Sequence, residues 1–412
     1  MIVTVTLNAA LDVTYVVEGG VRPGATHRVR SVSERAGGKG VNTARVLASQ
    51  GEPVLALGLA GGTAGAALRA DLGAAGVPHR FTAVAGATRR TVAVVAAPPT
   101  APDGPDGPDG PDTGSGATGE VTGFWEPGPQ VTAAEWARFV ADFGAALDHG
   151  VRAVVLAGSL PPGVPRDAYA QLVRLASGAG VPTLVDADAD ALREALAARP
   201  TLVKPNAEEA LRALGAESHP VATDTGRNVG AIGARPAAAD AATRTTGAPG
   251  GGAVPAPAPR PTPAWRPAPT VSGECLDGAA ARASEPEPAP APASDRSERP
   301  LVTAPGVLAR RLVEAGARHA VVSAGADGLV ACWGGRLLAV VPPRVVVGNA
   351  TGAGDAASAA LALALARGTG PAEALAHAVA LSAAAVAAPL AGDVAPDVLA
   401  ELAPLVAVRD LT

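Results

Sequence analysis

Residues 150–215 decide the fold class, and they read GVRAVVLAGSLPPGVPRDAYAQLVRLASGAGVPTLVDADADALREALAARPTLVKPNAEEALRALG. The apolar segments 150–158, 181–187 and 201–206 predict buried strands. Each is followed by a segment whose apolar residues recur at helical spacing. Strands that alternate with helices in this way predict right-handed βαβ units and a mainly parallel sheet.

The same alternation continues on both sides of this stretch. Alternating or β-branched segments predict further strands at 2–8, 54–60, 88–97 and 319–325. Helical spacing predicts helices at 41–50, 65–76, 306–316, 352–368 and 372–389. The α/β pattern therefore extends over most of the chain, and we predict one α/β domain spanning residues 1–412.

Two segments interrupt the alternation. Residues 98–119 contain the repeat PDGPDGPDGPD, and residues 216–300 are rich in Pro, Ala and Gly. Neither segment can bury enough apolar surface to offset the entropy of ordering it. We predict that both are disordered insertions in surface loops, because the alternation resumes in phase after the longer one.

Composition excludes several classes of protein. The net charge of −5 argues against a nucleic-acid or anionic-membrane surface. The two cysteines, Cys275 and Cys332, provide neither a disulfide framework nor a metal-ligand cluster. The opening MIVTVTLNAALD lacks a basic leader, and no apolar run is long enough to span a membrane. We expect a soluble cytoplasmic protein.

The segment 349–355, NATGAGD, gives the sharpest indication of chemistry. Gly352 and Gly354 let the backbone turn tightly, so that N–H groups at the start of the following helix point the same way. Such amides stabilise negative charge on a transferring phosphoryl group. Asp355 can then accept the proton of an attacking hydroxyl. The alternative is a structural glycine turn in which Asp355 is an ordinary first-turn acid.

Two further motifs begin helices. In GGKGVN (37–42), the glycines let a polyol approach the backbone, and Asn42 offers a donor and an acceptor to hydroxyl groups. A purely structural glycine turn is the alternative. In KPNAEE (204–209), Asn206 and Glu209 lie three residues apart and can hold Mg²⁺ through water. The alternative for this pair is a helix N-terminus capped by Asn206.

The order of the motifs resembles that of the ribokinase-like (phosphofructokinase B) family of sugar kinases. The matching features are Asp12 after the first strand, GGKGVN (37–42), Thr88-Arg89, FWEPGP (124–129), GSLPPG (158–163), KPNAEE (204–209), VSAGADG (322–328) and NATGAGD (349–355). The chain is most similar in these segments to the 1-phosphofructokinase and tagatose-6-phosphate kinase branch. The resemblance covers nearly the whole chain apart from the two insertions.

The resemblance implies a role for each matched residue on the acceptor side. The positions that hold the sugar hydroxyls are Asp12, Gly38 and Asn42. Arg89 matches the position that grips the phosphate already present on the substrate, since its planar guanidinium pairs with two phosphate oxygens at once. Lys39 and Ser159 assist in that grip.

The resemblance likewise implies a nucleotide side that binds ATP and Mg²⁺. Its matched positions are Lys204, Asn206, Glu209 (a magnesium ligand through water), Ser323, Gly325 and Gly328. Gly352, Ala353 and Gly354 match the anion hole, and Asp355 matches the catalytic base. Asp186-Ala187-Asp188 departs from the Asp-Thr-Ser-Gly usual at that place in the family, which leaves the role of Asp186 open.

The implied fold is a doubly wound, mainly parallel sheet flanked by helices, with a small β lid subdomain. The lid strands fall at about 12–35, 88–97 and 120–125, and in this family the lid often forms a homodimer interface. The implied reaction is phosphorylation of fructose 1-phosphate to fructose 1,6-bisphosphate. Tagatose 6-phosphate and fructose 6-phosphate are the alternative substrates, and a non-catalytic sugar-phosphate sensor is the alternative class. No nucleic acid or membrane partner is expected.

Overall fold

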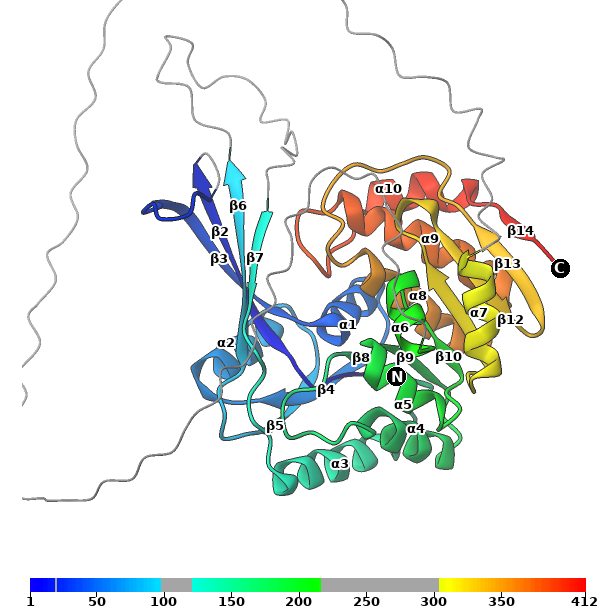
Figure 1. The fold of residues 1–412 in the computed structure, drawn as a ribbon, viewed down its shortest axis with the longest axis horizontal. Helices are drawn as coiled ribbons and strands as arrows, with labels where there is room; N and C mark the ends of the chain where they lie inside the picture. The colour runs from blue at the N-terminus through cyan, green and yellow to red at the C-terminus, as the bar shows by residue number, and fades with distance from the viewer. Residues whose placement is uncertain (19–20, 98–120, 216–303) are drawn as a thin grey trace, which may run out of the picture. The chain divides into compact units, whose positions relative to one another are not determined.

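The computed structural model describes residues 1–18, 21–97, 121–215 and 304–412, and all of these belong to one compact unit. The predicted insertions at 98–119 and 216–300 lie outside the described residues. Two sheets organise the described part of the chain (Figure 1).

The larger sheet has ten strands and is parallel over most of its width. In order across the sheet, its strands are β14 (Val408–Asp410), β13 (Arg336–Val340), β12 (Leu329–Trp333), β11 (His319–Ser323), β10 (Leu202–Val203), β9 (Thr183–Ala187), β8 (Ala153–Gly158), β1 (Ile2–Thr6), β4 (Val54–Ala60) and β5 (His79–Ala83).

The first strand lies inside the sheet, and the chain winds away from it in both directions. β1 pairs in parallel with β4 on one side and with β8 on the other. The chain first proceeds outward to β5 and later returns to add β8 through β11. The strand order therefore reverses beside β1. In open α/β sheets ligands bind outside the carboxyl ends of the strands at such a reversal, and we call this place, beside the carboxyl ends of β1 and β8, the crevice.

Helices cover both faces of the large sheet (Figure 1). One apolar cluster contains Val3 and Val5 with Phe139, Tyr169 and Leu308, and the other contains Ile2 with helical leucines. Helices of the first cluster are α3 (Ala133–Leu147), α4 (Ala168–Gly178), α5 (Ala189–Leu196), α6 (Ala207–Ala213) and α7 (Ala304–Glu314). Those of the second are α1 (Lys39–Ser49), α2 (Gly62–Ala74), α8 (Ala353–Arg367), α9 (Pro371–Ala387) and α10 (Pro396–Leu402).

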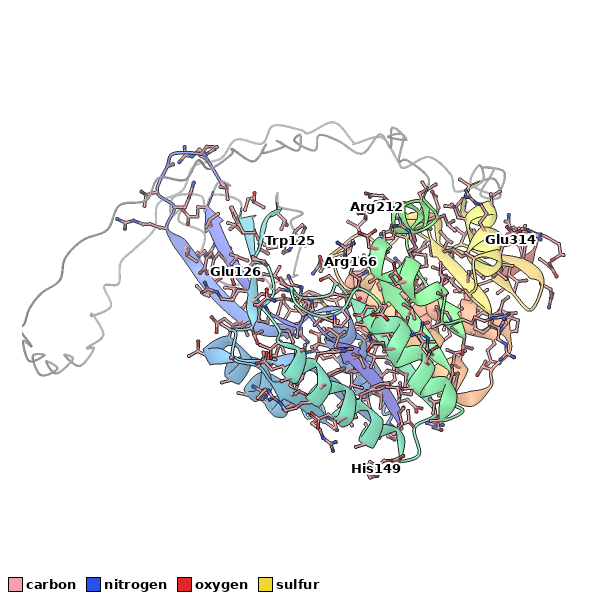
Figure 2. All side chains as sticks on the ribbon, turned by 60° about the horizontal axis from the view of Figure 1, so that its bottom comes forward. Trp125, Glu126, His149, Arg166, Arg212 and Glu314 are labelled. Carbon is pink, nitrogen blue, oxygen red and sulfur yellow. The ribbon has the colours of Figure 1, made fainter. Side chains whose placement is uncertain are left out.

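The second sheet has four strands, and we call it the small sheet. In order, its strands are β3 (Val29–Gly37), β2 (Ala10–Glu18), β6 (Arg89–Ala97) and β7 (Val121–Trp125). Its strands β2 and β3 pack against α2, and its edge strand β7 ends at the exposed Trp125 (Figures 1 and 2). β2 leaves β1 directly and β3 leads directly into α1, so the small sheet is connected to the crevice.

The predicted α/β class, with a mainly parallel sheet covered on both faces, is confirmed. Several elements were not predicted: β5, α3, α10 and the antiparallel strands β12 to β14. The β12–β13 hairpin turns at Gly334 and Gly335, whose φ angles of 61° and 81° are both positive. This is the backbone that a two-residue hairpin turn requires, so Gly-Gly between apolar segments was the missed indication.

Candidate active site

The predicted site residues gather at the crevice beside β1. Asp12 and Arg89 come from the small sheet, Lys39 and Asn42 from the start of α1, and Asp355 from the first turn of α8. The carboxyl ends of β8, β9 and β10 contribute Ser159, Asp186 and Lys204. Ligands of open α/β sheets bind at this edge, where the strand order reverses.

The acceptor side is built around Asp12 and Arg89. Asp12 lies opposite Thr91 of β6 and opposite Arg35 of β3. A side chain on Gly37 would collide with it, since an added Cβ would lie 1.9 Å from Asp12 Oδ2. Burial raises the pKa of Asp12 to about 6, opposed by a hydrogen bond with Thr91 and by the Arg89 charge. Near neutral pH the Asp12 carboxyl group can therefore accept a hydrogen bond when ionised or donate one when protonated.

Arg89 is held against the end of β1 by a residue that the sequence analysis did not select. Its Nε donates to the carbonyl oxygen of Asn8 over 3.1 Å, and the Asn8 side-chain amide donates to Ser159 Oγ over 3.0 Å. Asn8 Oδ1 is buried with no hydrogen-bond partner among the described residues. Gly128 packs on Asn8, because a Cβ on Gly128 would lie 2.2 Å from Asn8 Oδ1.

The start of α1 needs glycine for space as well as for conformation. Gly38 has φ 108°, and a Cβ there would approach Thr6 Cγ2 to 2.8 Å. A Cβ on Gly40 would lie 2.7 Å from the carbonyl oxygen of Val5. The glycines thus bring the helix start into contact with β1, which places Lys39 and Asn42 over the crevice.

Asn42 and Asp355 form a buried pair. The Asn42 side-chain amide donates to Asp355 Oδ2 over 2.8 Å, and the two residues are 6% and 7% exposed. Burial raises the pKa of Asp355 to about 7, and the negative charge of Asp186 adds to this effect. The hydrogen bond from Asn42 and the charges of Lys204 and Lys39 act in the opposite direction. A carboxylate with a pKa near the working pH suits a general base.

The turn before Asp355 leaves the N–H groups of Gly354 and Asp355 without a side-chain cap, while the Ala353 N–H donates to the Ala350 carbonyl oxygen over 3.3 Å. Gly352 precedes the helix with φ 92°, and no side chain caps the helix N-terminus. A Cβ on Gly352 would lie 3.0 Å from Ala391 Cα, and a Cβ on Gly354 would lie 3.6 Å from Lys204 Nζ. The first four N–H groups of a helix have no partner within it, so they and the Lys204 ammonium favour negative charge here.

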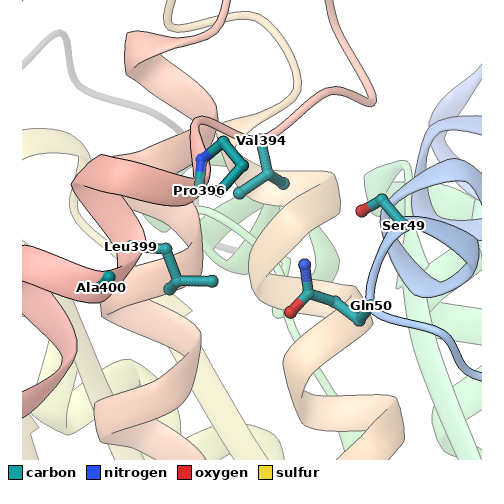
Figure 3. Close-up of a pocket in the computed structure, with 6 residues that line it drawn as sticks. All are labelled: Ser49, Gln50, Val394, Pro396, Leu399 and Ala400. Atoms are coloured by element: carbon teal, nitrogen blue, oxygen red, sulfur yellow. The ribbon is translucent and has the colours of Figure 1, made fainter.

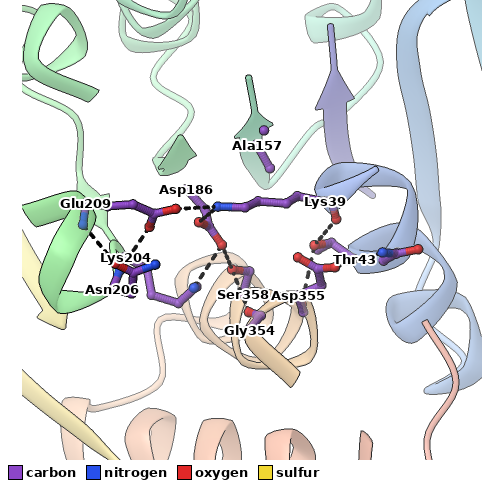
Figure 4. A network of polar contacts seen from close by, with 12 residues as sticks. Lys39, Thr43, Ala157, Asp186, Lys204, Asn206, Glu209, Gly354, Asp355 and Ser358 are labelled. Carbon is purple, nitrogen blue, oxygen red and sulfur yellow. Dashed lines mark hydrogen bonds and ion pairs between the residues drawn. The ribbon is translucent and has the colours of Figure 1, made fainter. Parts of the chain in front are cut away.

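An ion-pair network links this turn to the nucleotide side (Figure 4). Asp186 Oδ1 lies 3.1 Å from Lys39 Nζ, and its Oδ2 lies 2.8 Å from Lys204 Nζ. Ser358, one turn after Asp355, donates to Asp186 over 2.7 Å. Burial by itself raises the pKa of Asp186, but the two lysines outweigh it and bring the pKa to about 2.

Lys39 also contacts Glu209 Oε1 over 3.1 Å. Burial lowers the pKa of the Lys39 ammonium, but Asp186 and Glu209 outweigh burial and raise it above its ordinary value. In this structure Lys39 therefore contacts the carboxylates of Asp186 and Glu209, while its assistance to Arg89 in binding a substrate phosphate stays a prediction.

The capping alternative for Asn206 is confirmed. Asn206 Oδ1 accepts a hydrogen bond from Glu209 N over 2.8 Å, and Glu209 Oε2 accepts one from Asn206 N over 3.0 Å. This reciprocal pair starts α6 and leaves Glu209 Oε1 for Lys39. Asn206 also forms a β-bridge with Ser323, which places the segment from Ser323 to Gly328 beside the start of α6.

The structure thus brings Lys39, Asn42, Lys204, Glu209 and Asp355 into one contact network. Arg89 and Ser159 form a second group around Asn8, and Asp12 interacts with the charge of Arg89. Three participants were not selected from the sequence: Asn8, Thr43, whose Oγ1 lies 3.3 Å from Asp355 O, and Ser358. Single Asn, Thr and Ser residues carry no motif, although the position of Asn8 at the end of β1 was a usable indication.

A cavity of 270 Å³ lies elsewhere, between the end of α1 and α10 (Figure 3). Its lining is Ser49, Gln50, Val394, Pro396, Leu399 and Ala400. No predicted site residue lines it, and it presents no charged side chain. The chemistry of the charged network, rather than this apolar hollow, therefore defines the candidate site.

Within the described residues, no helix is both long and apolar enough to cross a bilayer.

Comparison with solved structures shows the same fold in phosphofructokinase-2 from Escherichia coli, solved with fructose-6-phosphate (23% identity, 97% of this chain and 98% of that chain, TM-score 0.66). The tetrameric inhibited form of the same enzyme is also similar (22% identity, 98% of both chains, TM-score 0.66). A Thermotoga maritima protein described as a "possible 1-phosphofructokinase" matches over 100% of both chains (19% identity, TM-score 0.64).

The sequence itself matches a family model over most of its length. The model is described as pfkB family carbohydrate kinase, and it matches residues 4–100, 130–238 and 297–397. These ranges include the start of α1, the ends of β8 to β10 and the turn before α8, which supply the residues of the crevice. The chain therefore belongs to the pfkB family of carbohydrate kinases.

Proposed function

We propose that this protein transfers the γ-phosphoryl group of ATP to a hydroxyl of a small sugar phosphate, with Asp355 as the catalytic base. The observation that carries the proposal is the buried Asp355 carboxyl group, hydrogen-bonded to Asn42 beside an uncapped helix N-terminus. Two lysines of the adjoining network supply positive charge. A non-catalytic sensor would need the binding residues but would not need a base whose pKa lies near neutrality.

The roles of the chain's own residues follow from this arrangement. The acceptor hydroxyl, held by Asp12 and Asn42, loses its proton to Asp355 as its oxygen attacks the γ-phosphorus atom of ATP. The bond between that phosphorus and the β–γ bridging oxygen breaks, and ADP leaves. The amides of Ala353, Gly354 and Asp355 and the Lys204 ammonium stabilise the charge that develops on the transferring group. The crevice holds both reactants in line, which removes most of the entropic barrier to their reaction.

The residues on the nucleotide side fit a hydrated Mg²⁺. Asp186 and Glu209 both approach Lys39 Nζ to 3.1 Å, so their oxygens already surround a positive charge. The described residues contain no group of three or more His, Cys, Asp or Glu side chains that could hold a metal ion. When bound with ATP, Mg²⁺ supplies positive charge to the phosphates, and Glu209 would hold it through a water molecule.

For the substrate we propose fructose 1-phosphate, with fructose 1,6-bisphosphate as the product. Arg89 and Lys39 offer cationic groups at the crevice, which favours a substrate that already carries a phosphate. The unpartnered Asn8 Oδ1 offers an acceptor for a sugar hydroxyl. Tagatose 6-phosphate and fructose 6-phosphate present the same groups at different spacings and remain the alternative substrates.

We also propose that the small sheet is a lid over the sugar and that two copies of the chain associate through it. Large apolar side chains on its strands are exposed: Val32, Val121, Phe124 and Trp125 are 56%, 63%, 55% and 76% exposed. Exposed apolar groups gathered on one sheet are typical of an association surface.

The proposal is tested by measuring ADP release with a panel of these three sugar phosphates and their unphosphorylated sugars. We expect Asp355→Asn to lower kcat by about 10²- to 10⁴-fold while leaving ATP binding nearly unchanged, since only the proton acceptor is removed. Asp397→Asn is the matched control, because Asp397 is an exposed acid in the first turn of α10. Equal turnover by the two variants would make Asp355 an ordinary first-turn acid.

A further inference from the structure

A bidentate ion pair joins two segments that lie far apart in the sequence. Arg35 belongs to β3 of the small sheet, and Asp393 belongs to the loop between α9 and α10. Arg35 Nη1 donates to Asp393 Oδ2 over 2.8 Å, and Arg35 Nη2 donates to Asp393 Oδ1. The Arg35 side chain is 19% exposed, so the pair is partly shielded from solvent.

The loop that carries Asp393 packs directly against the proposed catalytic residues. A Cβ on Gly352 would lie 3.0 Å from Ala391 Cα, so this loop backs the anion-binding turn. Gly392 lies over α1, since a Cβ there would be 3.4 Å from Asn42 Cα and 3.0 Å from Arg45 Cδ. The loop therefore contacts both the turn that begins α8 and the residue that holds Asp355.

The other end of the ion pair is fixed at the base of the small sheet. Arg35 lies opposite Asp12 in the β2–β3 register. The next residue, Ala36, donates its backbone N–H to Asp71 Oδ2 over 2.8 Å, and Asp71 also pairs with Arg45 of α1. Arg35 is thus held in place by strand pairing and by its neighbour, and Asp393 receives a fixed partner.

From this geometry we propose that Arg35 and Asp393 are positioning residues for phosphoryl transfer. Their ion pair holds the loop 389–393 against Gly352 and Asn42, and so keeps the anion-binding amides aligned with the Asp355 carboxylate. Neither residue touches a reactant in this account. The inference rests on the proposed phosphotransferase function, because it assigns the pair to the alignment of that site.

The kinetic test compares Asp393→Asn, Arg35→Gln and the double variant with the wild-type chain. We expect each to lower kcat about 30-fold with less than about a threefold change in the KM for the sugar phosphate, since small misplacements of reacting groups act on turnover. The double variant should be no worse than either single variant, and Asp393→Glu should retain most of the activity. Glu401→Gln is the control, because Glu401 forms an exposed bidentate pair with Arg344.

Three kinetic results would overturn the inference: a kcat for Asp393→Asn within twofold of wild type, an effect on KM alone, or additive losses in the double variant. A second measurement does not depend on turnover. Hydrogen exchange of the amides of Ala353 and Ala356, which donate to the carbonyl oxygens of Ala350 and Gly352, should be about tenfold faster in Asp393→Asn than in wild type or Glu401→Gln. Unchanged hydrogen exchange in Asp393→Asn would refute the positioning role of the Arg35–Asp393 ion pair. Faster exchange in a protein that phosphorylates no sugar would support that role and refute only the proposed function.

Discussion

At the scale of single residues, the pKa of Asp355 links burial to chemistry. An exposed aspartate would be ionised at neutral pH but would be a weak base. Burial raises the pKa of Asp355 to about 7, and the hydrogen bond from Asn42 prevents a larger rise. The same pair thus sets how strongly Asp355 attracts a proton and where its carboxylate points.

This pKa predicts how turnover depends on pH. The base must be ionised, so kcat should rise as the pH increases through about 7, the pKa of Asp355. Removing the hydrogen bond in Asn42→Ala should move this limb to higher pH, because that bond lowers the pKa. The measurement is kcat at saturating substrates from pH 5.5 to 9. A limb that stays in place in Asn42→Ala would contradict the assignment.

Arg89 and Arg90 provide a matched pair for testing phosphate recognition. Arg89 is held at the crevice by Asn8, whereas Arg90 forms an exposed ion pair with Glu126. We expect Arg89→Ala to raise the KM for a sugar phosphate by about 10- to 100-fold, the cost of losing a hydrogen bond to a charged group. Arg90→Ala should change it less than about twofold. Similar effects on an unphosphorylated sugar would show that Arg89 does not bind the phosphate.

At the scale of elements, helix N-termini supply much of the candidate site. α1, α6 and α8 all begin beside the crevice, and the three starts differ in how they are capped. α6 is closed by the reciprocal bonds of Asn206 and Glu209, whereas α1 and α8 begin at Gly38 and Gly352 without a side-chain cap. The uncapped starts keep their amides available to bound anions.

Substitution of the two glycines at opposite ends of α8 distinguishes the effect of backbone strain on stability from an effect on catalysis. Gly352 and Gly368 both have left-handed φ angles, 92° and 69°, but a Cβ meets neighbours only at Gly352. We expect Gly368→Ala to destabilise the protein by about 1 kcal/mol with normal kcat. Gly352→Ala should cost roughly 1–3 kcal/mol and also lower kcat at least tenfold, because the anion-binding turn must move. Chemical denaturation and steady-state kinetics measure both effects, and normal kcat in Gly352→Ala would argue against an anion-binding turn.

For the whole molecule, the small sheet is the proposed association surface, and several of its large apolar side chains are exposed. We expect Trp125→Glu to convert a homodimer into monomers and to raise the KM for the sugar phosphate, since a charge would replace the exposed apolar side chain. Leu405→Glu is the control, because Leu405 is 60% exposed but lies outside the small sheet. Sedimentation velocity gives the oligomeric state. A wild-type monomer, or a dimer that Trp125→Glu leaves intact, would contradict association through this sheet.

The fold was predictable wherever a local sequence pattern indicated both the type of element and whether that element is buried. The strands β4 and β8 are continuous apolar runs, and β1 and β9 are buried along their whole length, because helices cover both faces of the sheet. The antiparallel strands β12 and β13 were missed because their apolar residues do not form part of a strand–helix alternation. α3 has an amphipathic pattern and a capping box at Thr132, which a closer reading of local spacing would have found.

The α/β class and the candidate phosphate-binding turns could be predicted from the sequence, because periodicity and glycine turns are local features of the linear chain. Only the tertiary structure decided which of those residues meet. Asp186 contacts Lys39 and Ser358, and Arg35 contacts Asp393, across separations of 147 to 358 residues. Asp186 also contacts Lys204, which follows the neighbouring strand of the sheet. Such pairs depend on how the sheet winds in both directions from β1, and no local pattern encodes that.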